Sequence, residues 1–299
     1  MQIIVGTDGS PAARVACDLV AERDWPAGTH VVVLTAASPM VDLSGIAPPA
    51  GARAGTDLEA ARAIAEAAAE GLRARGLSVE ADVGIGDPAS LLITSARERL
   101  ADLIVVGHRG RGPVASAVLG SVSAYLVDHA PCPVLVARGP TISRMLLATD
   151  GTQSSMAIPR VLHAWGAAFR GLPVEVLCVA QRDEFVTPWA GEPDEDAVIA
   201  EHVRIAEHVA DEMVELGWTA AAVVRSGEPA REIVRAGDEW RADLIVTGSR
   251  GIGPLRRIVA GSVGHDVLLH AHSSVLVVRG LVPARIRTPA FAPGAVGVA

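Results

Sequence analysis

The amino-acid sequence predicts two α/β domains in tandem, each a doubly wound parallel sheet with helices on both faces. Three observations carry this prediction. The chain repeats itself at an interval of 141 residues, short apolar runs alternate with helical patterns in both halves, and those runs are apolar along their whole length. Strands that are covered on both faces have this character, and the alternation of strands with helices is typical of parallel sheets.

The repeat is clearest in two segments of 39 residues that begin at Ala101 and Ala242 and match without a gap at 21 positions. Upstream, GIGDPAS (84–90) corresponds to RSGEPAR (225–231), and IIVGTDGS (3–10) corresponds to LLATDGTQ (146–153). A chain of 299 residues is long enough for two domains of ordinary size. We therefore expect domains over 1–140 and 141–281, joined by almost no linker.

Each element of the first half follows from its local pattern. Five runs rich in β-branched residues have the length of strands: QIIVGTD, HVVVLTAA, LSVEADVG, DLIVVG and PVLVAR. Amphipathic stretches between them predict helices over 12–23, 57–75 and 88–100, and Gly76 is a typical C-cap for the second. The long inserts 39–56 and 182–194 are expected to be mobile or functional loops, and 282–299 a flexible tail.

Composition excludes several classes of protein. Half of the residues are hydrophobic and only 3% are aromatic, so two cores can form and both must be aliphatic. The sequence contains no run of 18 or more apolar residues, so it predicts no membrane span. The N-terminus lacks the features of a secretion signal, and we therefore expect a cytoplasmic protein. A net charge of −8 without a basic block argues against nucleic-acid binding. The three separated cysteines predict buried free thiols.

The sequence contains no lysine, and all 26 of its Lys and Arg residues are arginine. A Walker A loop needs a lysine on the phosphates, and Schiff-base chemistry needs a lysine amine, so both are excluded. No GxSxG, HExxH or CxxC motif is present. His202 and His208 are six apart on a predicted helix, a poor spacing for a shared metal ion, and surface or structural roles are favoured for the histidines.

A carboxylate follows the first strand of each half. Ligands of open parallel sheets bind beyond the carboxyl ends of the strands, where the strand order reverses. Asp8 lies there after Gly6 and Thr7, and it can accept a hydrogen bond from a ribose hydroxyl or help to hold a metal ion near phosphates. The alternative is that Asp8 caps the next helix. Recurrence in the second half favours the functional role, at Ala148, Thr149 and Asp150.

Glycines form a second feature, the pattern G-x2-G-x9-G-S, which occurs once in each half at identical spacing. The first pair follows a strand, where backbone N–H groups can form an anion-binding concavity. The third glycine opens a helix, whose N-terminus offers N–H groups and partial positive charge to a phosphate. The alternative is a plain connection with the serine as N-cap. The candidate residues are Gly107, His108, Arg109, Gly110, Arg111, Gly112, Gly120, Ser121, Val122 and Ser123, with Gly248, Ser249, Arg250, Gly251, Gly253, Gly261, Ser262 and Val263 in the second half.

Two further features support a nucleotide. Arg109 and Arg250 occupy equivalent places in the glycine stretches, where a guanidinium can bind phosphate through two hydrogen bonds, although exposed arginines are weakly constrained. The end of the second strand, at 36–38 and 179–181, is where a flat base can lie against the backbone.

These motifs resemble those of the universal stress protein family in its tandem two-domain form. The first half carries VGTDGSPAA, GDPA and the glycine pattern, and the second carries ATDGT, GEPAR and the same pattern. The resemblance covers about residues 1–281. It implies a Rossmann-like, adenine nucleotide α-hydrolase-like fold in each half, with five parallel strands in the order 3-2-1-4-5. It also implies that VLVAR and VLVVR pair within the chain as a pseudo-dimer, and that the chain forms a homodimer.

The resemblance further implies a function. Family members with the complete glycine motif typically bind ATP, with or without a divalent metal such as Mg²⁺ or Mn²⁺, and AMP or a cyclic nucleotide is a further candidate. Adenosine and ribose would lie near Gly6 and Asp8, and the triphosphate against 107–110 and 120–122. We expect a nucleotide-dependent stress or signalling regulator with a protein partner still to be identified. Without a general base or catalytic lysine, any ATP hydrolysis is expected to be slow. The alternatives are an ATPase or phosphotransferase, and an interaction module with vestigial sites.

Two departures from the motif predict that both sites bind nucleotide, the second more weakly. Ala148 adds a methyl group at the position of Gly6, and Gly264 lacks the hydroxyl of Ser123. Titration calorimetry on Gly120→Glu and Gly261→Glu should show that the first change removes the tighter binding event and the second the weaker one. Equal losses would contradict the asymmetry.

Overall fold

A computed structural model describes residues 1–37, 55–110, 119–181, 195–249 and 262–279. The strands in these ranges are β1 Gln2–Gly6, β2 His30–Ala37, β3 Ser78–Ile85, β4 Leu103–Gly107, β5 Val134–Ala137, β6 Met145–Thr149, β7 Pro173–Ala180, β8 Thr219–Ser226, β9 Leu244–Gly248 and β10 Ser274–Val278. The helices are α1 Pro11–Ala21, α2 Gly55–Arg73, α3 Pro88–Glu98, α4 Ser121–His129, α5 Gln153–Met156, α6 Ile158–Ala164, α7 Glu195–Glu215, α8 Pro229–Trp240 and α9 Ser262–His270.

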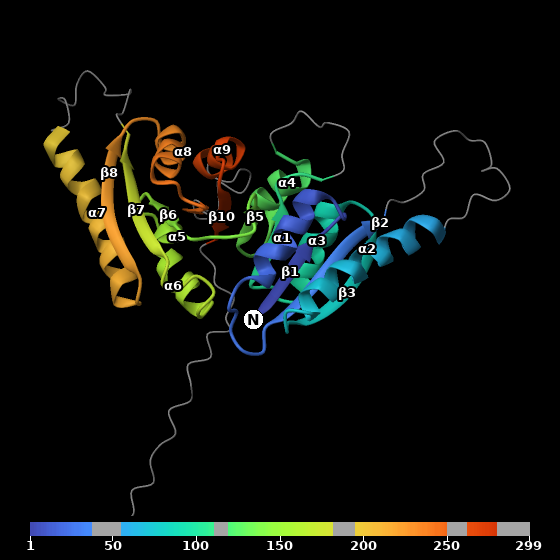
Figure 1. Cartoon of the computed structure of the whole chain (residues 1–299). Helices are drawn as coiled ribbons and strands as arrows, with labels where there is room; N and C mark the ends of the chain where they lie inside the picture. Colours follow the sequence, from blue (N-terminus) through green and yellow to red (C-terminus); the bar gives the residue numbers. More distant parts are fainter. Residues whose placement is uncertain (38–54, 111–118, 182–194, 250–261, 280–299) are drawn as a thin grey trace, which may run out of the picture.

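The described strands form one sheet in the order β3-β2-β1-β4-β5-β10-β9-β6-β7-β8 (Figure 1). Within each half all pairs are parallel and the order is 3-2-1-4-5, which confirms the predicted fold class. The halves meet where β5 pairs with β10 antiparallel, as the resemblance implies. Because of this antiparallel pairing, the strands of the two halves run in opposite directions. The carboxyl ends of one half therefore lie beside the amino ends of the other half.

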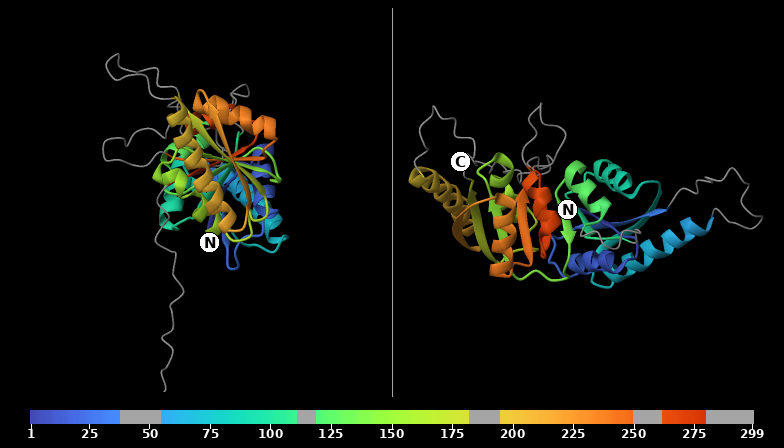
Figure 2. Two further views of the ribbon diagram at one scale, coloured as in Figure 1. Left: turned by 90° about the vertical axis from the view of Figure 1, so that its left-hand side faces the viewer. Right: turned by 90° about the horizontal axis from the view of Figure 1, so that it is seen from above.

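Helices flank the twisted sheet on both sides (Figure 2). One buried cluster contains side chains of α1, α2, α6 and α7, and the other contains side chains of α3, α4, α8 and α9. Both clusters run across the two halves without interruption, since each includes residues of β5 and of β10. The duplicated units therefore share one continuous pair of cores.

Local capping explains where several helices begin. The Ser10 hydroxyl oxygen accepts from the Ala13 N–H at 3.2 Å before α1, and Asp87 accepts from the Ser90 N–H at 2.8 Å before α3. Both caps precede a proline at the first helical position, where a missing N–H costs nothing. The second-half counterpart of α1 is divided into α5 and α6. Pro159 lies just after this break and explains it, because proline disrupts a continuing helix.

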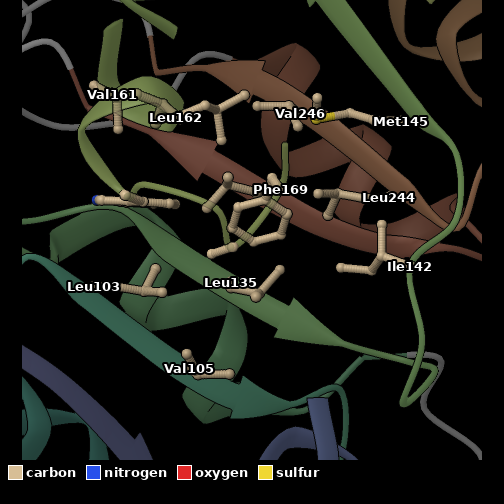
Figure 3. Packing of buried hydrophobic residues seen from close by; sticks show 14 of the residues in the cluster. Leu103, Val105, Leu135, Ile142, Met145, Val161, Leu162, Phe169, Leu244 and Val246 are labelled. Carbon is tan, nitrogen blue, oxygen red and sulfur yellow. The ribbon is translucent and has the colours of Figure 1, made fainter. Parts of the chain in front are cut away.

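Aliphatic side chains from both halves pack around the central strands. Leu135 of β5 lies opposite Leu276 of β10, and both are fully buried. Figure 3 shows Leu103, Val105 and Leu135 on one side of the junction and Phe169, Leu244 and Val246 among the residues on the other. Aromatic rings add to the same region: the ring centroid of Trp25 lies 6.5 Å from that of Trp165 and 5.9 Å from that of Phe169.

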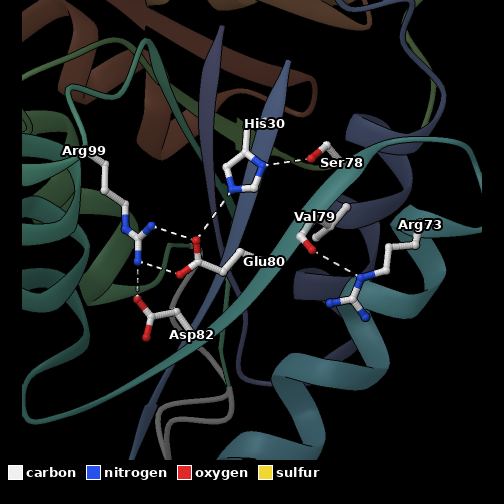
Figure 4. Close-up of polar contacts among 7 residues, drawn as sticks. All are labelled: His30, Arg73, Ser78, Val79, Glu80, Asp82 and Arg99. Atoms are coloured by element: carbon white, nitrogen blue, oxygen red, sulfur yellow. Dashed lines mark hydrogen bonds and ion pairs between the residues drawn. The ribbon is translucent and has the colours of Figure 1, made fainter. Parts of the chain in front are cut away.

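The edge strand β3 carries an ion-pair cluster (Figure 4). Arg99 donates to both carboxylate oxygens of Glu80, at 2.9 and 2.8 Å, and to Asp82 at 2.9 Å. The hydrogen bond from Arg99 lowers the pKa of Glu80. These groups are partly exposed, so the pairs add little stability, but charges on an edge strand discourage pairing with other chains.

The three cysteines, Cys17, Cys132 and Cys178, are free and buried, which confirms the prediction of buried free thiols. Burial raises the pKa of Cys17 and of Cys178 to about 11 and that of Cys132 to about 12. The thiolate is the nucleophilic form, and these groups remain thiols at neutral pH. Within the described ranges, every helix is too short or too polar to cross a membrane.

The β5–β10 junction generates a prediction about stability. Val136→Ala removes two methyl groups from a fully buried position opposite Val275, so we expect a loss of about 2 kcal/mol in the free energy of unfolding. The same substitution at Val214, which is 52% exposed on α7, should change it by no more than about 0.5 kcal/mol. Urea denaturation measures both, and equal effects would contradict the described packing.

Candidate nucleotide site

Each half has the same tight turn after its first strand. Gly9 and Gly151 both have φ +72°, a left-handed conformation that favours glycine. Their N–H groups donate to the hydroxyls of Thr7 and Thr149, at 3.2 and 3.3 Å. The turn places Asp8 and its counterpart at the carboxyl edge of the sheet. The repeated T-D-G sequence is therefore a structural unit that was visible in the sequence.

Hydrogen bonds decide the alternative role of Asp8. Its Oδ1 accepts from the N–H of Ser10 at 2.9 Å, and it is Ser10, not Asp8, that caps α1. Asp8 as the N-cap of α1 is thus wrong. The carboxylate instead stabilises the turn with one oxygen and directs the other, Oδ2, toward the glycine stretch of the same half. A methyl group built on Gly110 would lie only 2.8 Å from this oxygen.

The second carboxylate is held by more local donors. Asp150 Oδ1 accepts from the N–H and hydroxyl of Thr152, at 3.1 and 2.6 Å, and from the Ser155 hydroxyl at 2.8 Å. In the first half Ala13 occupies the position of Ser155 and has no hydroxyl. The Asp150 Oδ1 atom is consequently more engaged within its own turn than the equivalent atom of Asp8, a difference that the sequence interpretation missed.

The first glycine of each pattern makes room for a helix. A Cβ on Gly107 would collide with the carbonyl of Ala12 and lie 2.8 Å from the N atom of Ala13, and one on Gly248 would lie 2.7 Å from the N atom of Ser155. The first turn of α1, and that of α5, therefore packs directly on the end of the strand. These two glycines are required for packing, whether or not a phosphate binds beside them.

The N-cap residue of α4 is a glycine, which has no side chain to cap the helix. Gly120 is the N-cap residue and Ser121 is the first helical residue, so the alternative of a serine N-cap is wrong here. The Gly120 N–H donates to the His108 carbonyl at 2.8 Å, which holds this helix end against the glycine stretch. The N–H groups of the first turn have no acceptor within the helix, and together with the partial positive charge of the helix end they favour an anion at this place.

Two side chains have different roles from those expected. The Ser123 hydroxyl donates to the Gly107 carbonyl at 2.8 Å, so in this structure it joins α4 to the end of β4, and its contact with a phosphate stays a prediction. A Cβ on Gly6 would point at Leu92 and Val106, and the methyl group of its counterpart Ala148 lies in the buried core. Ala148 therefore gives no steric reason for weaker binding in the second half.

His108 connects the glycine stretch with the end of β5. Its N–H donates to the Ala137 carbonyl at 3.1 Å, and Ser249 donates in the same way to Val278 at 2.8 Å. His108 Nδ1 is buried and has no hydrogen-bond partner among the described residues. Burial, and next the positive charge of Arg138, lower the pKa of His108, so the ring is neutral at pH 7.

Several candidate residues contribute backbone only or are not described. Val122 and Val263 pack against the buried core, which leaves their N–H groups as possible contacts. Among the described residues, His, Cys, Asp and Glu form no group of three or more that could hold a metal ion. A single carboxylate, Asp8 or Asp150, fits a metal ion whose other ligands come from phosphates and water. Arg111, Gly112, Arg250, Gly251, Gly253 and Gly261 lie outside the described residues, as does the side chain of Ser262.

A cavity that the sequence did not predict begins at this edge. It has a volume of about 640 Å³ and runs from Thr7 and Gly9 between α1 and α2, where Ala67 and Gly71 are among the small residues that line it. An ion pair joins the two helices in each half. Arg75 pairs with Glu22 just beyond the ends of α2 and α1, and Arg160 Nε lies 2.8 Å from Glu212 Oε1 between α6 and α7. The signal in the sequence was the run of small residues on one face of α2.

The fold and these sites define a class of protein. It is a duplicated α/β protein in which each half has a carboxylate turn and a helix N-terminus at the carboxyl ends of its parallel strands. The model of the universal stress protein family matches residues 1–138 and 141–279. The chain therefore belongs to the universal stress protein family.

Relatives agree over nearly the whole chain. A universal stress protein of Mycobacterium tuberculosis strain H37Rv is 31% identical over 299 residues, which cover 93% of this chain and 96% of that relative. A universal stress protein of Mycolicibacterium smegmatis is 27% identical with the same coverage. The crystal structure of a universal stress protein from Archaeoglobus fulgidus, at 19% identity, has a TM-score of 0.65 and covers 94% of this chain and 98% of its own; it supports the fold alone.

The packing of α1 on β4 generates a prediction. Gly107→Ala should lower the free energy of unfolding by about 1–3 kcal/mol, because the new methyl group meets backbone atoms that cannot move without shifting α1. The matched change Gly139→Ala places its methyl group 4.0 Å from the nearest atom, the Thr141 carbonyl oxygen, and should be neutral or stabilising by up to about 1 kcal/mol. Thermal unfolding of both variants gives the comparison; a tolerated alanine at 107 is the contrary outcome.

Proposed function

We propose that this universal stress protein is a regulator that holds an adenine nucleotide, ATP foremost, in each half, and that nucleotide occupancy is the signal it carries. The observation that supports this most directly is the meeting of two motifs at one edge of the sheet. The Asp8 carboxylate approaches Gly110, and the carbonyl of His108 in the same stretch accepts from the N–H of Gly120 at the N-terminus of α4.

The chemistry of the two groups is complementary to the two ends of a nucleotide. A carboxylate accepts hydrogen bonds from the vicinal hydroxyls of a ribose, and backbone N–H groups at a helix N-terminus donate to phosphate oxygens. In the first half these are the Asp8 carboxylate and the N–H groups of Ser121 and Val122. Asp150, Ser262 and Val263 would act in the same way in the second half. Mg²⁺ or Mn²⁺ would enter with the phosphates and neutralise part of their charge.

The proposal favours holding a nucleotide over consuming it. The chain has no lysine to bind the transferred phosphoryl group, and the Asp8 Oδ1 atom is engaged in a turn. We expect multiple-turnover ATP hydrolysis to be well below about one per second, the low end for typical enzymes. A faster rate would favour the ATPase or phosphotransferase alternative.

The central experiment is mass spectrometry of small molecules released from freshly purified protein, together with calorimetric titration by ATP. Asp8→Asn should weaken binding in the first half by about 10- to 100-fold, the value of a hydrogen bond to a charged group, while the amide oxygen still accepts from Ser10. Asp150→Asn should act likewise on the second half. Asp24→Ala, an exposed carboxylate in the loop after α1, is the control and should bind as the wild type does.

No released nucleotide and no heat of binding with ATP, AMP or a cyclic nucleotide would contradict the proposal. That result would instead favour an interaction module with vestigial sites.

A further inference from the structure

Two arginines cross between the halves in a reciprocal way. Arg138 follows β5 and donates through Nη2 to the Leu268 carbonyl of α9 at 2.6 Å. Arg279 follows β10 and donates through Nη2 to the Val127 carbonyl of α4 at 2.5 Å. The two donors are 141 residues apart, and so are the two acceptors. We call Arg138 and Arg279 the crossed arginines.

The accepting carbonyls belong to the last turns of their helices, where carbonyls have no donor within the helix. In α4 the Leu126 carbonyl accepts from the N–H of Ala130 at 2.8 Å, and the next carbonyl, that of Val127, accepts from Arg279. In α9 the equivalent carbonyl of Val267 accepts from Ala271, also at 2.8 Å. Each crossed arginine thus completes the C-terminus of a helix in the other half, and its positive charge matches the partial negative charge there.

These side chains are partly buried as well as bonded. The Nε atoms of both are buried and have no hydrogen-bond partner among the described residues. Burial lowers the pKa of each, and nearby Asp128 partly offsets this for Arg279. A charged group in such a place is costly to leave unpaired, so the bonds to the helix carbonyls strongly constrain where each helix end can lie.

The helices that the crossed arginines hold are the ones that begin at the proposed nucleotide sites. α4 has nine residues and is about 13 Å long, so a shift of its C-terminal end is transmitted to Ser121 as a rigid movement. α9 begins at Ser262 and is equally long. Each arginine also directly follows the strand residue, Ala137 or Val278, that binds the glycine stretch of its own half.

We propose that the crossed arginines are positioning residues, each of which sets the helix N-terminus at the nucleotide site of the opposite half. Arg279 positions α4 for the first-half site, and Arg138 positions α9 for the second-half site. The inference rests on the proposed function, because it deepens the account of the same two sites.

If the crossed arginines acted only through their charge, removal of one of them would affect its own half of the protein rather than the opposite half. The positive charge of Arg138 helps to lower the pKa of His108, so this side chain is close to the glycine stretch of its own half. If the arginines acted only by attracting phosphate, removing one would weaken the site of its own half. Positioning through the helix weakens the other site instead.

The test separates the two sites with the carboxylate variants. In the Asp150→Asn background, Arg279→Met should weaken ATP binding at the first-half site about tenfold. In the Asp8→Asn background, the same change should leave the second-half site within about twofold. Arg138→Met should show the reverse pattern. Arg279→Lys should recover part of the loss, because an ammonium group can still donate to the Val127 carbonyl. The control is Arg170→Met, at an exposed position with the same change in net charge.

Loss of affinity in the arginine's own half, or equal loss in both, would overturn the inference. Hydrogen exchange gives a second readout that needs no nucleotide: Arg279→Met should speed exchange of the α4 amides and leave those of α9 unchanged. Unaltered exchange in α4 would overturn the positioning role even if no nucleotide binds. Absence of binding in the wild type, with the expected exchange pattern, would count against the proposed function only.

Discussion

The antiparallel pairing of β5 with β10 is the interaction on which the rest of this structure depends. It joins two parallel five-stranded sheets into one and makes both buried clusters continuous from half to half. It also sets the parallel strands of one half in the opposite direction to those of the other, so that the two carboxylate turns lie at opposite ends of the strands. The helices that end beside this junction, α4 and α9, are therefore close enough to receive an arginine from the neighbouring half.

Close approach of backbone explains more of the glycine pattern than phosphate binding alone does. Gly107 and Gly248 admit the first turn of a helix onto the end of a strand, and Gly110 admits a carboxylate. The same contacts bring the two motifs of each half together, because α1 starts from the turn that contains Asp8. A requirement of packing and a proposed requirement of binding thus coincide in a few residues, and both depend on the absence of a side chain.

The sequence predicted the elements well because local patterns determine them. The helix predicted over 88–100 is α3 at Pro88–Glu98, and the one over 12–23 is α1 at Pro11–Ala21. The roles of Asp8 and Ser10 could not be separated, since both are good capping residues and only the turn geometry decides between them. The crossed arginines had no local signal, because each donates to a backbone carbonyl more than a hundred residues away, and any residue type provides a carbonyl.

The two halves differ on one face of the sheet, where a cavity runs between α1 and α2 in the first half and Arg160 pairs with Glu212 between α6 and α7 in the second. If the halves were separate subunits, an unlike pair would have to form through the β5–β10 junction in competition with like pairs. A single polypeptide delivers one of each at every round of synthesis, at a high effective concentration. Specialisation of one half therefore carries no cost in mispairing, and the tandem arrangement leaves each half free to change on its own.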